Sequence, residues 1–422
     1  MIRRFLPRVY EGWLVAVSGS LVIVVTAAAF FHGFGTVFNP IREEIGISVT
    51  ATALAFSLRS QTGGFAAPLV GLALDRVGAR LVLLSGLAIA AGGLFALSFI
   101  QNLWQFYVAM MIIAVGASGA GGVAGYKATS TWFEKRRARA LAVVSVGGSF
   151  SGLLVIGVGF LVEEMGWRSA LRIMAILVLV LVIVPALNIR ERPARHAQPM
   201  DGFPRADNEE SFPEPSPLWG VPVRQAIRSR SFLLLVLGFA LVGFGSTALQ
   251  VHLIPFVESL GYSTSVASTT VAVFTFTTLF GRVGGGLLAD IHDKRTVIAL
   301  STVIVAAGLP ILAFATQLWQ VFAALMIIGV GFGGTIPVRQ AILADYYGAK
   351  HFGTMNGLMM LSVTFGSIFG PLVVGRAVDV TNGDYTIGWL ASSAVVASAI
   401  LLLWAARPQQ ELISTYGPRP PD

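Results

Sequence analysis

The sequence predicts an all-α membrane protein with twelve transmembrane helices in two pseudo-symmetric six-helix lobes. Three observations lead to this prediction: few charged residues, apolar segments of membrane-spanning length along the whole chain, and an internal repeat. Only 12% of the residues are charged and 55% are hydrophobic, whereas a soluble domain carries roughly 25% charged residues. About 20 apolar residues in a helix cross the hydrocarbon core of a bilayer, and apolar segments of this length recur throughout the chain.

The apolar segments form two sets of six, separated by a polar stretch rich in proline and charge. They lie at 13–38, 52–73, 80–100, 103–132, 138–161 and 169–189, and then at 232–256, 265–289, 296–315, 318–346, 353–376 and 385–405. The first segment is too long for a signal peptide and lacks a cleavage site, so we expect it to remain as a span. The polar stretch is typical of a linker. We therefore expect an N-terminal lobe at 1–190, a linker at 191–224, a C-terminal lobe at 225–406 and a tail at 407–422.

Lysines and arginines in the loops predict the orientation of the chain. One side holds Arg3, Arg4, Arg8, Arg76, Arg80, Lys135, Arg136, Arg137, Arg139, the linker cations, Lys294, Arg295, Lys350 and Arg407. The opposite loops hold only Arg42 and Arg168, with Arg376 near a helix end. Cytoplasmic loops carry the excess of such residues, so we expect cytoplasmic termini in a bacterial inner membrane. This asymmetry also explains the net charge of +8 without a nucleic-acid partner.

The second half of the chain repeats the first at a constant offset in residue number. Asp75 corresponds to Asp290, and at the same offset the LWQ sequence at 103–105 corresponds to that at 318–320. A repeat of six spans on each side of a cytoplasmic linker is typical of a two-lobed secondary transporter. Such a transporter binds its substrate between the lobes, near the middle of the membrane.

One charged motif lies in the short loop between the second and third spans, GLALDRVGAR at 71–80. It matches a G-x-x-x-D-R-x-G-R/K signature through Gly71, Asp75, Arg76, Gly78 and Arg80. The chain therefore resembles the major facilitator superfamily, which implies that fold. The glycine permits close helix packing, and the charges form a breakable cluster at the cytoplasmic gate. Candidate gating residues are Asp75, Arg76, Arg80 and, in the second half, Asp290.

A narrower resemblance lies at TWFEKRRARALAVVSVGGSFSG, residues 131–152. Its Trp132, Phe133, Lys135, Arg136, Arg137 and Ala140 look like those of the monocarboxylate transporter and oxalate/formate antiporter branch. YEGWLV at 10–15 partly matches the start of that branch. The branch also carries an arginine in its eighth helix, and Arg282 occupies that place, with Ala67 at the matching position of the first half.

The chain departs from this branch at three positions. Animal monocarboxylate carriers have an aspartate where Thr278 stands and a first-helix lysine where Gly33 stands, beside His32. Oxalate carriers use a lysine in the eleventh helix, and the segment 353–376 contains no lysine. These departures leave both the coupling ion and the anion open.

Three cations lie near the middle of predicted spans: Arg282, Lys127 and Arg339. Arg282 and Lys127 each lie eight residues from a charged helix end, or roughly 12 Å along a helix, and Arg339 lies nine residues before Gly348. We expect all three to share one depth and to lack an acidic partner in neighbouring spans. A charge at this depth costs roughly 2.5–3.5 kcal/mol and usually faces a cavity, where a carboxylate would suit an arginine.

Each cation also has a structural alternative. Arg282 could bind helix-end carbonyl groups, Lys127 could extend toward the cytoplasm, and Arg339 could form a strut to Asp345 or Gln340. Arg59, nearer the opposite membrane surface, is equally open to a gating and a surface-reaching role.

Further substrate-binding candidates are polar residues in spans predicted to line the cavity. These are Tyr126, His32, His252, Gln250 and Asn356. His32 and His252 could also carry a proton near neutral pH, although a satisfied core histidine is as reasonable for each. We find no cysteine, catalytic triad or metal-binding spacing, and we expect neither an enzyme nor a cofactor.

The sequence therefore predicts a secondary active transporter of a small organic carboxylate, such as lactate or pyruvate, working by alternating access. Proton symport is one coupling mode left open. The main alternative is a dicarboxylate or anion exchanger of the oxalate–formate type. A multidrug exporter is weaker, because cavity cations disfavour cationic drugs. Expected partners are the anion, protons in the symport case and membrane lipids, and we expect a monomer.

Overall fold

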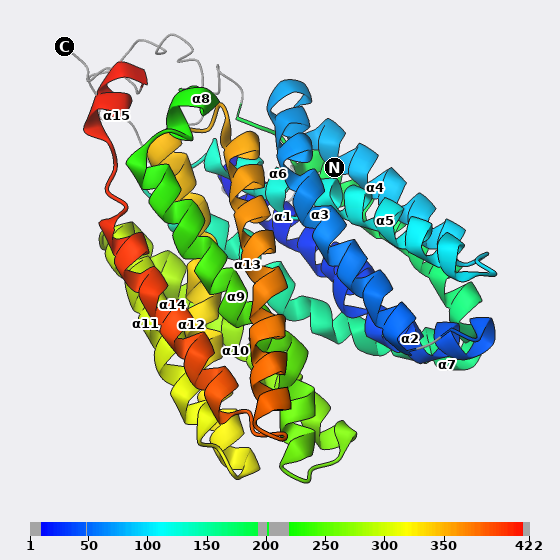
Figure 1. Cartoon of the computed structure of the whole chain (residues 1–422). Coiled ribbons are helices and arrows are strands. Elements are labelled where there is room, and N and C mark those ends of the chain that lie inside the picture. The colour runs from blue at the N-terminus through cyan, green and yellow to red at the C-terminus, as the bar shows by residue number, and fades with distance from the viewer. Residues whose placement is uncertain (1–9, 48, 193–200, 202–218, 417–422) are drawn as a thin grey trace. The chain divides into compact units, whose positions relative to one another are not determined.

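A computed structural model describes residues 10–47, 49–192, 201 and 219–416 of the chain. These residues form helices joined by short connections (Figure 1), apart from one isolated bridge between Gly220 and Gly348. The chain divides into two compact units. Unit 1 comprises Met1–Val221, Tyr347–Gly357 and Ser414–Asp422, and unit 2 comprises Pro222–Tyr346 and Leu358–Ile413. Each unit is described by itself.

Unit 1 contains the first seven α-helices and one π-helical turn. They are α1 (Glu11–Ala27), η2 (Ala28–His32), α2 (Phe34–Ile45), α3 (Val49–Val77), α4 (Ala79–Leu97), α5 (Leu103–Ala120), α6 (Val123–Ser130) and α7 (Arg137–Asn188). The turn η2 interrupts the first span beside Gly33, whose amide donates to the carbonyl oxygen of Ala28 at 2.8 Å. Such π-turns occur frequently at functional sites.

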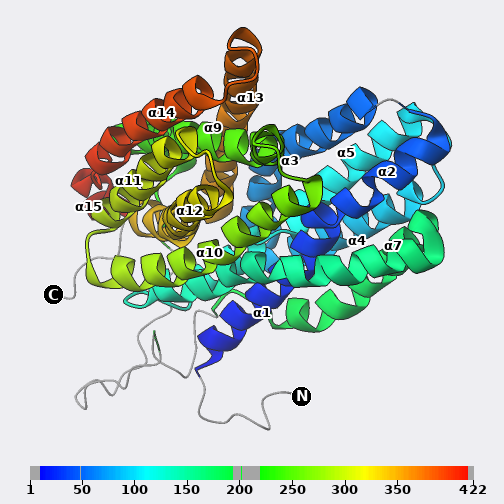
Figure 2. The same cartoon turned by 90° about the horizontal axis from the view of Figure 1, so that it is seen from below.

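The remaining helices lie wholly or partly in unit 2. They are α8 (Val223–Ala226), α9 (Arg230–Ser259), α10 (Thr264–Ile291), α11 (Lys294–Ala313), α12 (Leu318–Tyr347), α13 (Phe352–Val380), α14 (Thr386–Ala405) and α15 (Gln410–Tyr416). Helices α9, α11 and α14 lie side by side (Figure 1 and Figure 2). Helix α13 starts in unit 1 and continues in unit 2 after Gly357.

The twelve predicted spans are accounted for by these helices. Within the described residues, ten helical stretches are long and apolar enough to cross a membrane. One of them, the 52-residue α7, breaks at Gly166, where φ is 74°, and so supplies two spans. The 29-residue α3, which carries the charges of Arg59, Asp75 and Arg76, supplies the last.

The repeat in the sequence is also a repeat in helix boundaries. Helices α3, α4 and α5 begin at Val49, Ala79 and Leu103, and α10, α11 and α12 begin at the equivalent positions of the second half, Thr264, Lys294 and Leu318. The repeated LWQ sequence closes the turn before each fourth span. The side-chain oxygen of Gln105 accepts from the amide of Gln101 at 2.7 Å, and that of Gln320 accepts from the amide of Thr316 at 2.7 Å.

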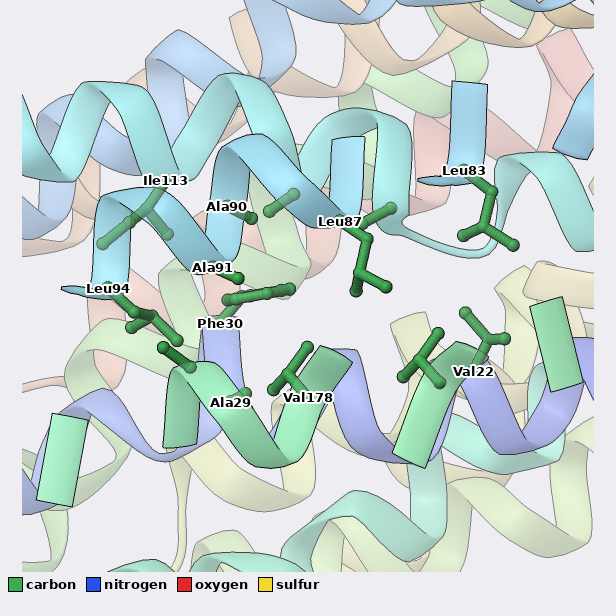
Figure 3. Close-up of a cluster of buried hydrophobic side chains, with 14 of the residues drawn as sticks. Val22, Ala29, Phe30, Leu83, Leu87, Ala90, Ala91, Leu94, Ile113 and Val178 are labelled. Atoms are coloured by element: carbon green, nitrogen blue, oxygen red, sulfur yellow. The ribbon is translucent and has the colours of Figure 1, made fainter. Parts of the chain in front are cut away.

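Small residues allow the helices inside each unit to approach closely. A Cβ atom at Gly116 would lie 2.3 Å from the amide nitrogen of Ala90, and one at Gly331 would lie 2.8 Å from that of Val305, the equivalent position. Figure 3 shows the core of unit 1, where one face of α4 packs against η2, α5 and α7. Its members include Leu83, Leu87, Ala90, Ala91, Leu94, Ala29, Phe30, Ile113 and Val178. Lipid tails are as apolar as these side chains, so close packing supplies the stabilisation.

Candidate functional site

The carboxylate of Asp75, at the end of α3, caps the start of α13. It accepts hydrogen bonds from the amides of Gly353 at 2.9 Å and Thr354 at 2.7 Å, and from the hydroxyl of Thr354 at 2.7 Å. These amides lie in the first turn of α13, where helical partners are missing and the helix dipole is positive. All of these residues belong to unit 1.

The motif glycine Gly71 makes this capping geometrically feasible. A Cβ atom at Gly71 would lie 2.1 Å from the carbonyl oxygen of Gly353, and one at Gly353 would lie 2.5 Å from that of Gly71. The same holds one turn further along, where Gly357 faces the backbone of Ala67. Only glycine permits this approach of α13 to α3.

Lys127, on α6, has acidic partners. Its Nζ lies 3.2 Å from Oδ1 of Asp75 and 3.3 Å from Oε1 of Glu191, and it donates to the carbonyl oxygen of Leu74 at 2.9 Å. The side chains of Lys127 and Asp75 are 3% and 5% exposed. The expectation that Lys127 lacks an acidic partner is therefore wrong, because Asp75 reaches it across helices and Glu191 follows the sixth span.

The other gating candidates lie around this cluster and at its counterpart in unit 2. Arg76 is exposed, and Arg80 donates to the carbonyl oxygen of Leu187 at 2.5 Å. Asp290 is half-buried in the last turn of α10. Nearby in the sequence, Lys294 pairs with Asp345 at 2.8 Å.

The two motifs that mark the narrower resemblance contact each other. The hydroxyl of Tyr10 donates to the carbonyl oxygen of Trp132 at 2.7 Å, and its ring packs edge-on against Trp132 and Phe133. Burial raises the pKa of Tyr10 to about 12, so its hydroxyl remains a donor at neutral pH. Glu11 forms an ion pair with Arg190, which follows the sixth span. These contacts join three segments: the start of the first span, the loop before α7 and the end of α7.

Arg282 lies half-buried on α10 between two glycines that pack against α12. A Cβ atom at Gly281 would lie 1.9 Å from the carbonyl oxygen of Val330, and one at Gly285 would lie 2.8 Å from Cα of Gly334. The contact fixes α10 on α12 and places Arg282 on a rigid base. A Cβ atom at Gly284 would meet nothing within 4 Å, so Gly284 is not a packing residue.

Arg339 lies at a different depth from Arg282. Gly285 lies against Gly334; Arg282 precedes Gly285 by three residues, and Arg339 follows Gly334 by five. Because α10 and α12 run in the same direction, the two arginines are separated by on the order of 10 Å along the helices. Arg339 is the one nearer Asp290, and its guanidinium lies 5.5 Å from the ring centre of Phe239. The expectation that the three cations share one depth is therefore wrong.

The predicted polar residues of unit 2 contact backbone carbonyl groups of the same unit. Nε2 of His252 lies 2.9 Å from the carbonyl oxygen of Pro371, and its ring contacts Tyr385. The exposed Gln250 donates to the carbonyl oxygen of Ser246 in the preceding turn, at 3.2 Å. The contact with Pro371 holds His252 between α9 and α13.

Three other predicted residues belong to unit 1. Tyr126 is buried beside Lys127, and Asn356 is 1% exposed, with neither side-chain amide atom hydrogen-bonded within the described part of the chain. His32 ends the π-turn η2, and its side chain lies outside the described atoms. Arg59 on α3 lies 5.1 Å and 5.0 Å from the ring centres of Phe31 and Phe34, which flank His32.

The Major Facilitator Superfamily sequence profile matches residues 20–286 and 235–420. The chain belongs to the major facilitator superfamily. The fold is similar to that of the Major Facilitator Superfamily transporter FucP in its outward conformation, with a TM-score of 0.70 at 16% identity, covering 94% of this chain and 99% of FucP.

Curated superfamily relatives are transporters, so this protein is a transporter and not an enzyme. Human monocarboxylate transporter 7 is 26% identical over 94% of this chain and 86% of its own length. Human monocarboxylate transporter 11 is 27% identical over 92% and 81%. The fungal MFS transporter asaE of Aspergillus flavus is 24% identical over 81% and 74%. The chain is a multi-pass membrane transporter that resembles the monocarboxylate transporter branch.

The sequence did not mark several residues that contact the Asp75–Lys127 cluster and the loop before α7. Glu191 was assigned to the linker, and Thr354 was one hydroxyl among many in apolar helices. Asp201, which binds the loop before α7, lies in a stretch of mixed charge. No local pattern marks these residues, since each acts on a segment that is distant in the sequence.

Proposed function

We propose that this transporter carries a small organic monocarboxylate, such as lactate or pyruvate, by alternating access, with Arg282 as the anion's anchor. The proposal rests on one observation above the others: within unit 2, Arg282 stands on the rigid α10–α12 contact and lies further from Asp290 along the helices than Arg339 does. Lys127 pairs with Asp75 and Glu191, and Arg339 lies toward Asp290. The likeness to proteins named monocarboxylate transporters supports the same substrate class.

An arginine on a rigid base is suited to this task. Its planar guanidinium binds a carboxylate through two parallel hydrogen bonds. The cost of keeping the charge within the membrane is offset when an anion occupies the site. Gly281 and Gly285 lock α10 onto α12, so the guanidinium is held in place before the anion arrives. Tyr126, His32, Gln250, Asn356 and His252 remain candidate pocket residues, and Lys127 and Arg339 remain secondary candidates.

We assign the Asp75 cluster to a cytoplasmic gate. Its bonds to the first turn of α13 and to Lys127 are charge-assisted and can be exchanged for water when the gate opens. The asymmetry of loop lysines and arginines supports cytoplasmic termini, in a bacterial inner membrane. We further propose that the protein acts as a monomer among membrane lipids, with protons as co-substrate in the symport case.

Exchange of dicarboxylates is the competing function. It would favour two cations at one depth, and the axial separation of Arg282 and Arg339 speaks against a short dicarboxylate bridging them. The experiment uses purified protein in proteoliposomes with labelled lactate, pyruvate or oxalate. Monocarboxylate uptake driven by an inward proton gradient supports symport. Uptake that requires internal anion and ignores the proton gradient instead supports exchange.

A further inference from the structure

The linker between the lobes contributes a buried carboxylate to unit 1. Asp201 is 3% exposed and adopts a left-handed backbone conformation with φ of 58°. Its carboxylate accepts hydrogen bonds from three consecutive backbone amides: those of Glu134 at 3.1 Å, Lys135 at 3.0 Å and Arg136 at 3.0 Å. Its own amide donates to the carbonyl oxygen of Trp132 at 3.4 Å.

These three amides precede a helix that has no cap of its own. Helix α7 begins at Arg137, and the side chain of its N-cap residue, Arg136, makes no capping hydrogen bond. Amides at a helix start lack intrahelical partners, and the helix dipole favours a negative charge there. Asp201 supplies that charge from beyond the far end of the same helix, where an N-cap residue would ordinarily supply it locally.

The loop 131–136 also contacts the residues on both sides of Glu191, the partner of Lys127. It follows α6, which carries Lys127, by a few residues. Trp132 donates from its indole to the carbonyl oxygen of Arg190 at 2.9 Å, and the amide of Arg192 donates to the hydroxyl of Thr131 at 2.8 Å. Glu191, between those two arginines, pairs with Lys127. Any movement of this loop therefore shifts both partners of the ion pair.

We propose that Asp201 is a positioning residue for transport: it latches the linker onto the loop 131–136 and thereby fixes the start of α7 and the Lys127–Glu191 pair. The latch acts through the gate and does not touch the substrate. It consequently governs how fast the transporter cycles, and it leaves the apparent affinity for the anion unchanged. The inference does not depend on which anion is carried.

Hydrogen exchange of the full-length protein in lipid measures the latch directly. In Asp201→Ala, the amides of Glu134, Lys135 and Arg136 should exchange roughly tenfold faster, as expected for a lost helix cap. Asp201→Asn, which keeps an oxygen acceptor and loses the charge, should fall between this variant and wild type. Asp293→Ala is the matched control, because Asp293 caps α11 through the amide of Arg295 at 3.1 Å; it should leave the three amides unchanged.

Uptake kinetics supply the second readout. Both Asp201 variants should lower kcat severalfold and leave KM unchanged. The variant whose three amides exchange hydrogen faster should show the larger loss of kcat. Wild-type exchange of the three amides in both variants would overturn the latch. Faster exchange with unaltered kcat, or with a raised KM, would overturn the positioning role. Hydrogen exchange of the amides needs no substrate. A wrong substrate assignment therefore cannot change the hydrogen-exchange result.

Discussion

Nζ of Lys127 lies 3.2 Å from Oδ1 of Asp75, and both side chains are almost fully buried. Removing one member of a buried pair leaves an uncompensated charge. Lys127→Met should therefore lower the free energy of unfolding by about 3 kcal/mol, measured by thermal unfolding in detergent. Lys294→Met is the control, since Lys294 and Asp345 are 23% and 26% exposed, and exposed pairs contribute about 1 kcal/mol or less. Equal losses in the two variants would contradict a buried gate pair.

Gly71 should not tolerate a methyl group. Gly71→Ala places Cβ 2.1 Å from the carbonyl oxygen of Gly353, forcing α3 and α13 apart and weakening the Asp75 cap. We expect a loss of about 1–3 kcal/mol of stability together with loss of uptake. Gly92→Ala tests the same change on α4 where nothing lies within 4 Å, and it should be neutral or slightly stabilising. Similar behaviour of the two variants in melting and uptake assays would argue against close packing at Gly71.

His351 should make the stability of unit 1 sensitive to acid. Burial lowers the pKa of His351 below its usual 6.5; Lys350 and Lys127 act in the same direction, and Asp75 opposes them. The folded protein therefore binds fewer protons than the unfolded chain, so this stabilisation is present above pH 6.5 and is lost as the pH falls below it. Melting temperature should decrease between pH 7.5 and pH 5.5 with a smaller decrease in His351→Gln. An identical pH profile in that variant would exclude His351 as the source.

The order of the spans and the repeat could be predicted because they depend on local hydropathy and a constant offset. The depth of Arg339 could not. The sequence estimate counted residues back from Gly348, as if α10 and α12 ended at the same depth. The Gly285–Gly334 contact sets the register of the two helices. In that register α12, which ends at Tyr347, extends further than α10, which ends at Ile291. The partner of Lys127 was missed for a related reason, since Asp75 is distant in the sequence and lies on another helix.

Arg339 and Arg282 should separate in their kinetics. Arg339→Gln should chiefly lower kcat, because Arg339 lies toward the Asp290 end of α10 and is only a secondary cation for the anion. Arg282→Gln should chiefly raise KM, or abolish uptake, because it removes a bidentate contact worth roughly 1.5–3 kcal/mol. Initial rates over a range of lactate concentrations distinguish the two. The assignment of Arg339 would be contradicted if its variant raised KM as much as the Arg282 variant.

Substrate binding by Arg282 tests the central claim most directly. Isothermal titration of lactate, pyruvate and oxalate into purified wild type, Arg282→Lys and Arg282→Ala separates binding from gating. Arg295→Ala serves as a control, since Arg295 pairs locally with Asp293. We predict monocarboxylate binding to wild type and Arg295→Ala, weakening at least tenfold in Arg282→Lys, and no detectable binding in Arg282→Ala. Wild-type affinity in Arg282→Ala would contradict the account.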